Sequence, residues 1–366
     1  MPKLVQILAL IAIFVIASPN PHAQQPLSPK PSNTAASVPA APPENPPTSQ
    51  QVGPQAAPSQ QTPPVIRTVS ELVQLVAAVT DRHRAFVTDL NQNDFHILDN
   101  GHPEGISYFS RQTDLPLRIA LLLDTSNSVR DRLHFEQDAS IDFLTDILRR
   151  HKDMAFVMTF DNAPEVVQDY TGDMDLLTQA IERQRAGGGT ALDDAIYAAS
   201  QKLVSAPPAP GADPAVRHVL VIFSDGDDNL SDHAVSEALE MAQRAGVAIY
   251  AISTNTDWVS TEEGGKAHKS FKSHGEDLLQ NFADQTGGRA FFPYKTDDLA
   301  VSFQDIGAEL RSQYLIAFRP ETVIADGSFH ALKVSTGRKD LTVRTRKGYF
   351  APSRSSSPVL SPAPGH

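Results

Sequence analysis

The sequence predicts an α/β protein with a doubly wound, mostly parallel six-stranded sheet that is inserted in a small all-β sandwich. Between Leu117 and Leu310, apolar runs of strand length alternate with amphipathic stretches of helix length, which favours a parallel sheet with helices on both faces. On either side of this region, short runs alternate polar and apolar residues, as half-buried strands do. Each flank has too few strands for a secure core of its own, so we expect both flanks to share one sandwich.

The central region opens with a continuous apolar run at 117–123, which is typical of a strand covered on both faces. A helix is expected over 133–148, because apolar residues recur at fourfold spacing from Phe135 to Ile147. We expect the other strands at 154–160, 164–170, 217–225, 247–253 and 289–294. We expect the other helices at 174–184, 192–203, 235–242, 278–283 and 299–310. Right-handed crossovers then make the doubly wound strand order the default.

The two flanks of the central domain, which we place at 114–311, are expected to be strands. The N-terminal flank, residues 65–113, contains the runs "LVQLVAAVT" and "AFVTDL" and a hairpin at Asn100-Gly101. An Asn-Gly pair tolerates positive φ at both turn positions, which is a strong hairpin signal. The C-terminal flank, residues 312–350, contains three alternating runs, "QYLIAFRP", "FHALKVSTG" and "LTVRTRKGYF".

The ends of the chain do not look like folded structure. Residues 1–23 are typical of a signal peptide, with Lys3 before an apolar stretch too short to span a bilayer, although an uncleaved anchor remains an alternative. Residues 24–64 are rich in Pro, Ala and Gln and are expected to be a disordered linker, and 351–366 a disordered tail. We therefore expect a secreted or periplasmic protein without a membrane span.

Composition excludes several classes of function. The chain has no cysteine, so it has no disulfide framework, no thiolate metal site, no cysteine nucleophile and no lipid anchor on a cysteine. Its formal net charge is −12. Nucleic acids and anionic membranes are bound through Lys and Arg, so this acidic balance argues against both as partners.

Oxygen-bearing side chains gather where the first and fourth predicted strands end. "DTSNS" follows the first strand and supplies Asp124, Ser126 and Ser128, and the fourth strand ends at Asp225. Ligands bind doubly wound sheets beyond the carboxyl ends of the strands, where the strand order reverses. Thr190 follows three glycines and opens a helix whose positive end points toward the same region. Five oxygen donors without His or Cys suit Mg²⁺, Mn²⁺ or Ca²⁺ rather than Zn²⁺ or Cu²⁺.

"DTSNS", "GGGTAL" and "SDGDD" together resemble the metal-ion-dependent adhesion site of von Willebrand factor type A domains. The resemblance covers roughly 117–310, and "NDFHILDNG", "GGRAFF", "ELRSQYLIAF" and "DGSFHALKV" resemble a secreted bacterial subgroup of these proteins. It implies that the Ser and Thr hydroxyls bind the metal and that the two Asp bind directly or through water. A partner's Glu or Asp would then fill the open position. Asn127 departs from the family pattern, where a small residue is frequent, but Asn tolerates left-handed conformations.

Three functions are compatible with these residues. The first is a binding module without chemistry, and the second is a hydrolase that uses the same cation to polarise an ester or phosphate. The hydrolase needs a base, and His233 is the one candidate near the site's loops. The third is a metal-free scaffold held by its β-sandwich, since a Ser/Asp turn after a strand is often only a helix N-cap. We expect the nearby acids Asp193, Asp194, Asp227 and Asp228 to be helix-start and solvated turn residues without function.

A long polar segment, residues 254–279, follows the fifth predicted strand and emerges at the same edge of the sheet as the metal site. Connections of this kind usually take two to six residues. The segment carries the chain's only Trp. We expect it to form a partner-selecting rim, although Trp258 could instead pack back onto the domain. The rim residues are Trp258, Lys266, Lys269, Phe271 and Lys272.

Overall fold

The computed structural model of the chain describes residues 72–111, 115–208, 216–254, 273–293, 296–320 and 326–352. The chain divides into two units, Met1–Ile66 and Arg67–His366, and every described residue belongs to the second. The expected signal peptide, the linker at 24–64 and the tail from 353 onward lie outside the described residues. Within the described part, no helix is long and apolar enough to cross a membrane.

The centre of the structure is a six-stranded sheet with the order β10-β9-β8-β5-β6-β7. Its strands are β5 (Leu117–Asp124), β6 (Met154–Phe160), β7 (Pro164–Thr171), β8 (Arg217–Ser224), β9 (Ala248–Ser253) and β10 (Arg289–Phe291). All neighbours pair in parallel except β7, which is antiparallel to β6 at one edge. The predicted doubly wound, mostly parallel sheet is therefore confirmed, and β5 and β8 flank the point where the strand order reverses.

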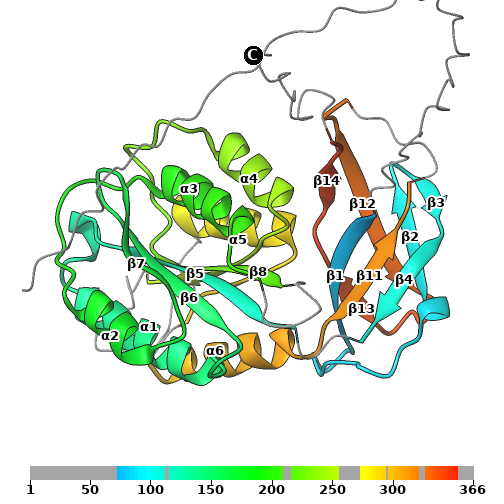
Figure 1. The fold of residues 1–366 in the computed structure, drawn as a ribbon, viewed down its shortest axis with the longest axis horizontal. Coiled ribbons are helices and arrows are strands. Elements are labelled where there is room, and N and C mark those ends of the chain that lie inside the picture. The colour runs from blue at the N-terminus through cyan, green and yellow to red at the C-terminus, as the bar shows by residue number, and fades with distance from the viewer. Residues whose placement is uncertain are drawn as a thin grey trace, which may run out of the picture. The chain divides into compact units, whose positions relative to one another are not determined.

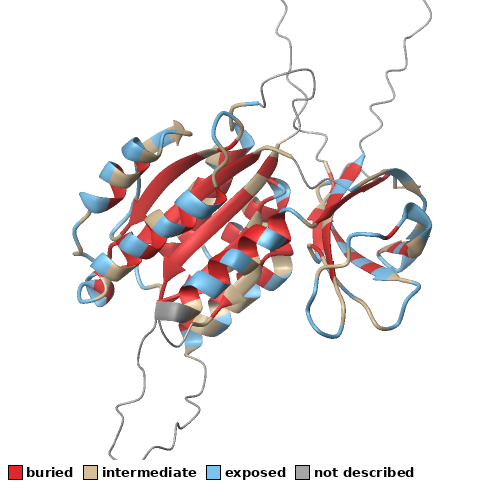
Figure 2. Ribbon diagram, turned by 90° about the horizontal axis from the view of Figure 1, so that it is seen from below, coloured by how far each residue is buried: buried red, intermediate tan, exposed pale blue. Residues whose placement is uncertain are grey.

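Three helices cover each face of this sheet (Figure 1). One face carries α1 (Leu133–Ile147), α2 (Met174–Glu182) and α6 (Thr296–Leu310), and the other α3 (Leu192–Val204), α4 (Val235–Arg244) and α5 (His274–Thr286). Residues of β5 alternate between the two cores, with Leu121 on the first side and Leu122 on the second. Because both faces are covered, the sheet is buried throughout its centre (Figure 2), which explains the continuous apolar run of β5.

The flanking strands form two four-stranded sheets, β13-β1-β11-β4 and β14-β12-β2-β3. Their bounds are β1 (Val73–Thr80), β2 (Phe95–Asp99), β3 (His102–Glu104), β4 (Ile106–Ser110), β11 (Tyr314–Phe318), β12 (Phe329–Thr336), β13 (Thr342–Arg344) and β14 (Gly348–Phe350). Each sheet mixes strands from both flanks, because β1 pairs with β11 and β2 with β12. Side chains of β1, β2, β11, β12 and β14 enclose a common apolar core.

Two details of the flanks differ from the sequence prediction. Residues 85–90 form no strand, only a single bridge at Phe86. Their backbone groups bond locally or to side chains instead, as the Leu90 amide does to the hydroxyl of Tyr314. The last predicted run, 341–350, is divided between β13 and β14, which belong to different sheets. The predicted Asn-Gly hairpin is confirmed, with both residues at positive φ.

A buried charge pair joins the α/β domain to these strands. Glu309 near the end of α6 is fully buried and forms an ion pair with Arg344 of β13. The Tyr250 hydroxyl of β9 donates to Glu309 Oε1 at 2.7 Å. Removing one member of such a pair leaves an uncompensated buried charge, so this contact is a sensitive point of the fold.

Candidate metal centre

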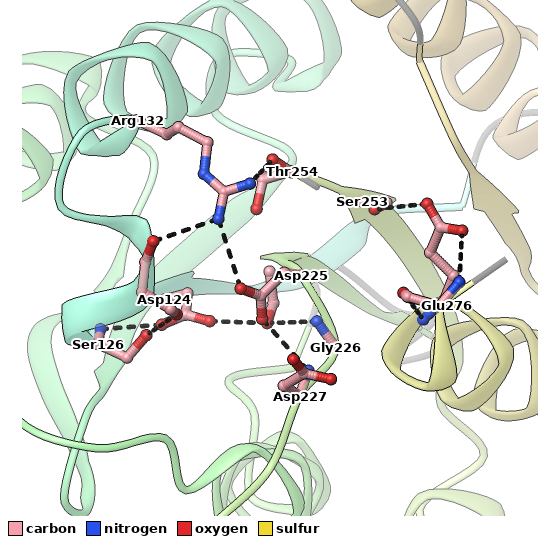
Figure 3. Close-up of polar contacts among 12 residues, drawn as sticks. Asp124, Ser126, Arg132, Asp225, Gly226, Asp227, Ser253, Thr254 and Glu276 are labelled. Carbon is pink, nitrogen blue, oxygen red and sulfur yellow. Dashed lines mark hydrogen bonds and ion pairs between the residues drawn. The ribbon is translucent and has the colours of Figure 1, made fainter. Parts of the chain in front are cut away.

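Two neighbouring strands end at the site, and their end residues bond to each other. β5 ends at Asp124, which is fully buried, and β8 ends at Ser224. The Ser224 hydroxyl donates to Asp124 Oδ2 at 2.7 Å, and the Ser126 amide donates to Oδ1 at 2.9 Å. These bonds fix the Asp124 carboxylate at the carboxyl edge of the sheet, where the strand order reverses (Figure 3).

Burial governs the protonation of Asp124. The pKa of this carboxyl is raised to about 6, chiefly by burial and to a smaller extent by the nearby charge of Asp225. Hydrogen bonds from Ser126 and Ser224 act in the opposite direction. The ionised form is therefore costly in the folded protein unless positive charge compensates it.

The hydroxyls of "DTSNS" lie close together. Ser126 Oγ and Ser128 Oγ are 2.8 Å apart, on a short 3-10 turn at Asn127–Val129. Asn127 lies inside this turn and is not among the described residues with positive φ, so its tolerance of left-handed conformations is not needed here. The Asn127 amide donates to the carbonyl of Gly188 at 3.3 Å, which joins this loop to the glycine-rich loop.

Two asparagines that were not predicted from the sequence, Asn162 and Asn229, position Thr190 and the glycine before it. The side-chain Oδ1 of Asn229 accepts from the Thr190 amide at 3.0 Å, and the backbone amide of Asn229 donates to the Thr190 carbonyl. Asn162 accepts from the Gly189 amide at 3.0 Å. Gly188 has φ +75°, and a Cβ there would lie 2.7 Å from the Asn162 side chain, so this position requires glycine. Thr190 is buried at the same edge of the sheet.

The Arg132 side chain forms hydrogen bonds with three separate segments of the site (Figure 3). Its guanidinium donates to Asp225 Oδ2 at 3.4 Å, to the Ser128 carbonyl at 3.2 Å and to the Thr254 carbonyl at 2.6 Å. One side chain therefore joins the first motif, the end of β8 and the end of β9. Glu136, one helical turn further, is fully buried, and burial together with the charge of Asp124 raises its pKa well above the usual range.

Arg132 and Glu136 were not predicted from the sequence, because a charged residue in a first helical turn is usually solvated. Their spacing after Ser128 was the one available clue, since residues four apart share a helix face.

The donor chemistry of the site fits a hard divalent cation. Its oxygens come from two carboxylates and from hydroxyls, which are ligands that Mg²⁺, Mn²⁺ and Ca²⁺ accept. The nearby charge of Asp225 adds to the raised pKa of Asp124, and a cation would relieve this repulsion. Among the described residues, at this site or elsewhere, no group of three His, Cys, Asp or Glu side chains could hold a metal ion. Hydroxyl oxygens would therefore have to complete the coordination.

Two acids that we expected to be without function have structural roles. Asp194 accepts from the amides of Asp232 and His233, and the His233 ring nitrogen Nδ1 lies 2.6 Å from its carboxylate. Asp228 accepts from the Asp193 amide. These contacts fix the start of α3 to the loop after β8. Burial raises the pKa of Asp193 to about 7.

The predicted partner rim cannot be compared with the structure. Its residues, Trp258, Lys266, Lys269, Phe271 and Lys272, lie outside the described residues. The structure describes the two sides of this segment. Thr254 follows β9 at the metal-site edge, and Ser273 caps α5 by accepting from the Glu276 amide at 3.1 Å. The rim stays a prediction.

Strand order and loops together define a doubly wound α/β domain with hydroxyl and carboxylate oxygens gathered at its switch point. The sequence profile of the von Willebrand factor type A domain matches residues 119–306, slightly more than half of the chain. The chain belongs to this family. A comparison with curated protein sequences gives no significant match.

Several solved structures are similar to this chain. A von Willebrand factor type A protein from Catenulispora acidiphila is 13% identical over 74% of this chain and 76% of that chain, with a TM-score of 0.44. The conserved hypothetical protein BatB from Bacteroides thetaiotaomicron is 17% identical over 54% and 100%, with a TM-score of 0.41. Proximal thread matrix protein 1 from the mussel byssus, described with a zinc-occupied MIDAS motif, is 17% identical over 57% and 48%, with a TM-score of 0.41.

Proposed function

We propose that this chain is a non-catalytic binding module that captures an acidic group of a protein partner through a divalent cation. Side-chain oxygens of Asp124, Ser126, Ser128, Thr190 and Asp225 would hold the cation, with Mg²⁺ as the first candidate and Mn²⁺ or Ca²⁺ as alternatives. The cation would supply an open electrophilic position for a partner's Asp or Glu.

One observation carries the proposal: the chain places two interacting carboxylates and a pair of hydroxyls at the switch point of the sheet. Asp124 is ionisable and fully buried, and within the described part of the chain its hydrogen bonds come from Ser126 and Ser224, which favour its charged form. An arrangement that concentrates negative charge in a buried position is costly without a cation. The hydroxyls of Ser126 and Ser128 add neutral oxygen donors beside it.

The chain's own residues orient these donors. Ser224 and the Ser126 amide fix the Asp124 carboxylate, and Asn229 fixes the backbone of Thr190. Arg132 contacts Asp225 and adds positive charge at the partner-facing edge. Such a positive edge would favour an acidic partner and speed its association.

A pull-down from an envelope fraction, run in Mg²⁺ and in EDTA, tests the proposal. We expect wild-type chain to retain a partner only in Mg²⁺, and Asp124→Asn to retain it in neither. Asp232→Asn is the matched control, because this exposed carboxylate lies in the loop after β8 and no described side-chain contact depends on it. Equal retention in EDTA and Mg²⁺ would favour the metal-free scaffold.

The hydrolase alternative rests on His233, whose Nδ1 is oriented by Asp194 at 2.6 Å and whose ring stacks on Tyr197 at 4.0 Å. No contact joins it to the five proposed ligands in the described structure, so the binding function is favoured. Metal-dependent turnover of generic esters or phosphates that is lost in His233→Gln would reverse this preference. The secreted or periplasmic location and the domain limits given above are proposed with the same function.

A further inference from the structure

A second candidate site lies away from the metal centre. A pocket of about 460 Å³ opens between the end of α4 and strands β1, β12 and β14, a volume within the usual range for small-molecule sites. None of the five proposed metal ligands lines it. Its polar and aromatic lining includes Gln243, Arg244, His330, Arg346, Tyr349 and Phe350.

Arg346 carries a buried positive charge into this pocket without an acidic partner among the described residues. Its Nη2 donates to the Gln74 carbonyl at 2.8 Å, and its Nη1 to the Gln243 carbonyl at 3.3 Å. Its Nε–H is buried and has no acceptor in the described structure. Burial lowers its pKa to about 10, which still leaves the guanidinium protonated at neutral pH.

A second arginine, Arg244, also lines the pocket. The Arg244 guanidinium lies 4.4 Å from the centre of the Phe350 ring and pairs with Glu240 at 2.8 Å. The pocket's described lining includes no Asp or Glu. Because Glu240 already pairs with Arg244, the uncompensated positive charge of this pocket comes from Arg346.

His330 is oriented toward the pocket by a buried polar cluster. Asp99 lies 2.9 Å from His330 Nδ1 and accepts from the Tyr349 hydroxyl at 2.7 Å. An ionised carboxylate only accepts hydrogen bonds, so Nδ1 carries the proton. Nε2 then remains available to a ligand, because no described protein group bonds to it. Asp99, His330 and Tyr349 come from β2, β12 and β14, so the sheet itself fixes their geometry.

We propose that this pocket binds a small organic carboxylate with an apolar or aromatic body. Arg346 and Arg244 supply the donors that match a carboxylate, and His330 Nε2 supplies a further polar contact. The apolar body would lie against Val73, Pro320 and Phe350, which line the same pocket. Inorganic phosphate presents the same anionic chemistry without an apolar body, so it is expected to bind more weakly.

Isothermal titration calorimetry with the full chain tests the pocket, with benzoate as the probe and benzamide as its neutral counterpart. EDTA is present throughout, so that benzoate cannot bind through a metal at the other site. We expect benzoate to bind about tenfold or more tightly than benzamide, because charge-assisted hydrogen bonds are the stronger ones. Inorganic phosphate is titrated in a third arm and is expected to bind more weakly than benzoate.

Variants separate the pocket from unspecific anion binding. Arg346→Gln and Arg244→Gln should each weaken benzoate binding about tenfold. Arg338→Gln is the matched control, because this arginine is exposed, pairs only with Asp340 in the described structure and does not line the pocket. If Arg346→Gln fails to fold, Arg244→Gln at the more exposed position decides.

The proposal is overturned if benzamide binds as tightly as benzoate, or if the pocket variants bind benzoate like Arg338→Gln. Tighter binding of phosphate than of benzoate would overturn the assigned ligand class. Because the assay contains EDTA, its outcome is independent of the proposed metal function.

Discussion

Replacing Asp124 with asparagine should stabilise the metal-free protein at neutral pH. The side chain keeps its shape but loses a charge that is buried without compensation. Burial raises the pKa of Asp124 from 3.8 to about 6. At about 1.4 kcal/mol for each pKa unit, the ionised carboxylate lowers the free energy of unfolding by up to about 3 kcal/mol at pH 7.5.

The pH dependence has a definite sign. Below pH 3.8 both folded and unfolded Asp124 are protonated, and the group contributes nothing. Between pH 3.8 and about 6 the folded state holds a proton that the unfolded state has released, so wild-type stability falls as pH rises. Above pH 6 the loss is complete. Asp124→Asn lacks this dependence, so its advantage over wild type should be about 2–3 kcal/mol larger at pH 7.5 than at pH 4.

Urea denaturation in EDTA at the two pH values measures this difference, with the exposed carboxylate variant Asp340→Asn as the control. Mg²⁺ at about 1,000 times its dissociation constant should reverse the order, because it would then stabilise the folded wild type by about 4.1 kcal/mol. A difference between wild type and Asp124→Asn that is the same at both pH values would refute the electrostatic argument. Equal stabilisation of both proteins by Mg²⁺ would refute the assigned ligand.

Three further predictions concern other parts of the chain. Deleting the strands after residue 311 should unfold β1 and β2, which lose their partners β11 and β12; a protease-resistant 65–310 fragment would contradict this. Arg344→Met should lower the free energy of unfolding by about 3–5 kcal/mol, because Glu309 stays buried without its partner. Arg338→Met, at an exposed pair, should change it by less than about 1 kcal/mol in the same denaturation assay. Trp258→Ala should weaken partner binding by about 2 kcal/mol with little change in melting temperature; lost stability with unchanged affinity would show a structural role.

The fold of the α/β domain could be predicted from the sequence, because local sequence patterns reflect its physical requirements. A strand covered on both faces must be apolar throughout, as β5 is, and parallel strands must be joined by right-handed crossovers. These rules place the ends of β5 and β8 together, and so bring Asp124 near Asp225. The division of 341–350 into two strands was not predictable, since the break is set by contacts with distant elements. The Lys347 amide, for example, donates to the Gln285 carbonyl of α5.

The polar surroundings of the site were beyond sequence reasoning for a similar reason. Asn162 and Asn229 are common loop residues, and only the folded chain shows that they fix the glycine-rich loop. Arg132 has no distinctive sequence context either. In the folded chain its guanidinium donates to the carbonyls of Ser128 and Thr254, which lie far apart in the sequence. Side chains that connect distant loops leave no periodic pattern, so they appear only when the topology is known.

The mixing of early and late strands in both flanking sheets has a consequence for how the chain becomes folded. The Leu90 amide bonds to the hydroxyl of Tyr314, 224 residues later, and β1 finds its partner β11 only at a similar distance. A chain synthesised from its N-terminus therefore presents unpaired β1 and β2 edges while the whole α/β domain is still being made. We expect the two sheets to close late in folding, because contacts of such long sequence separation form slowly. Until then, the unpaired edges of these strands can pair with other chains, so we expect them to promote aggregation.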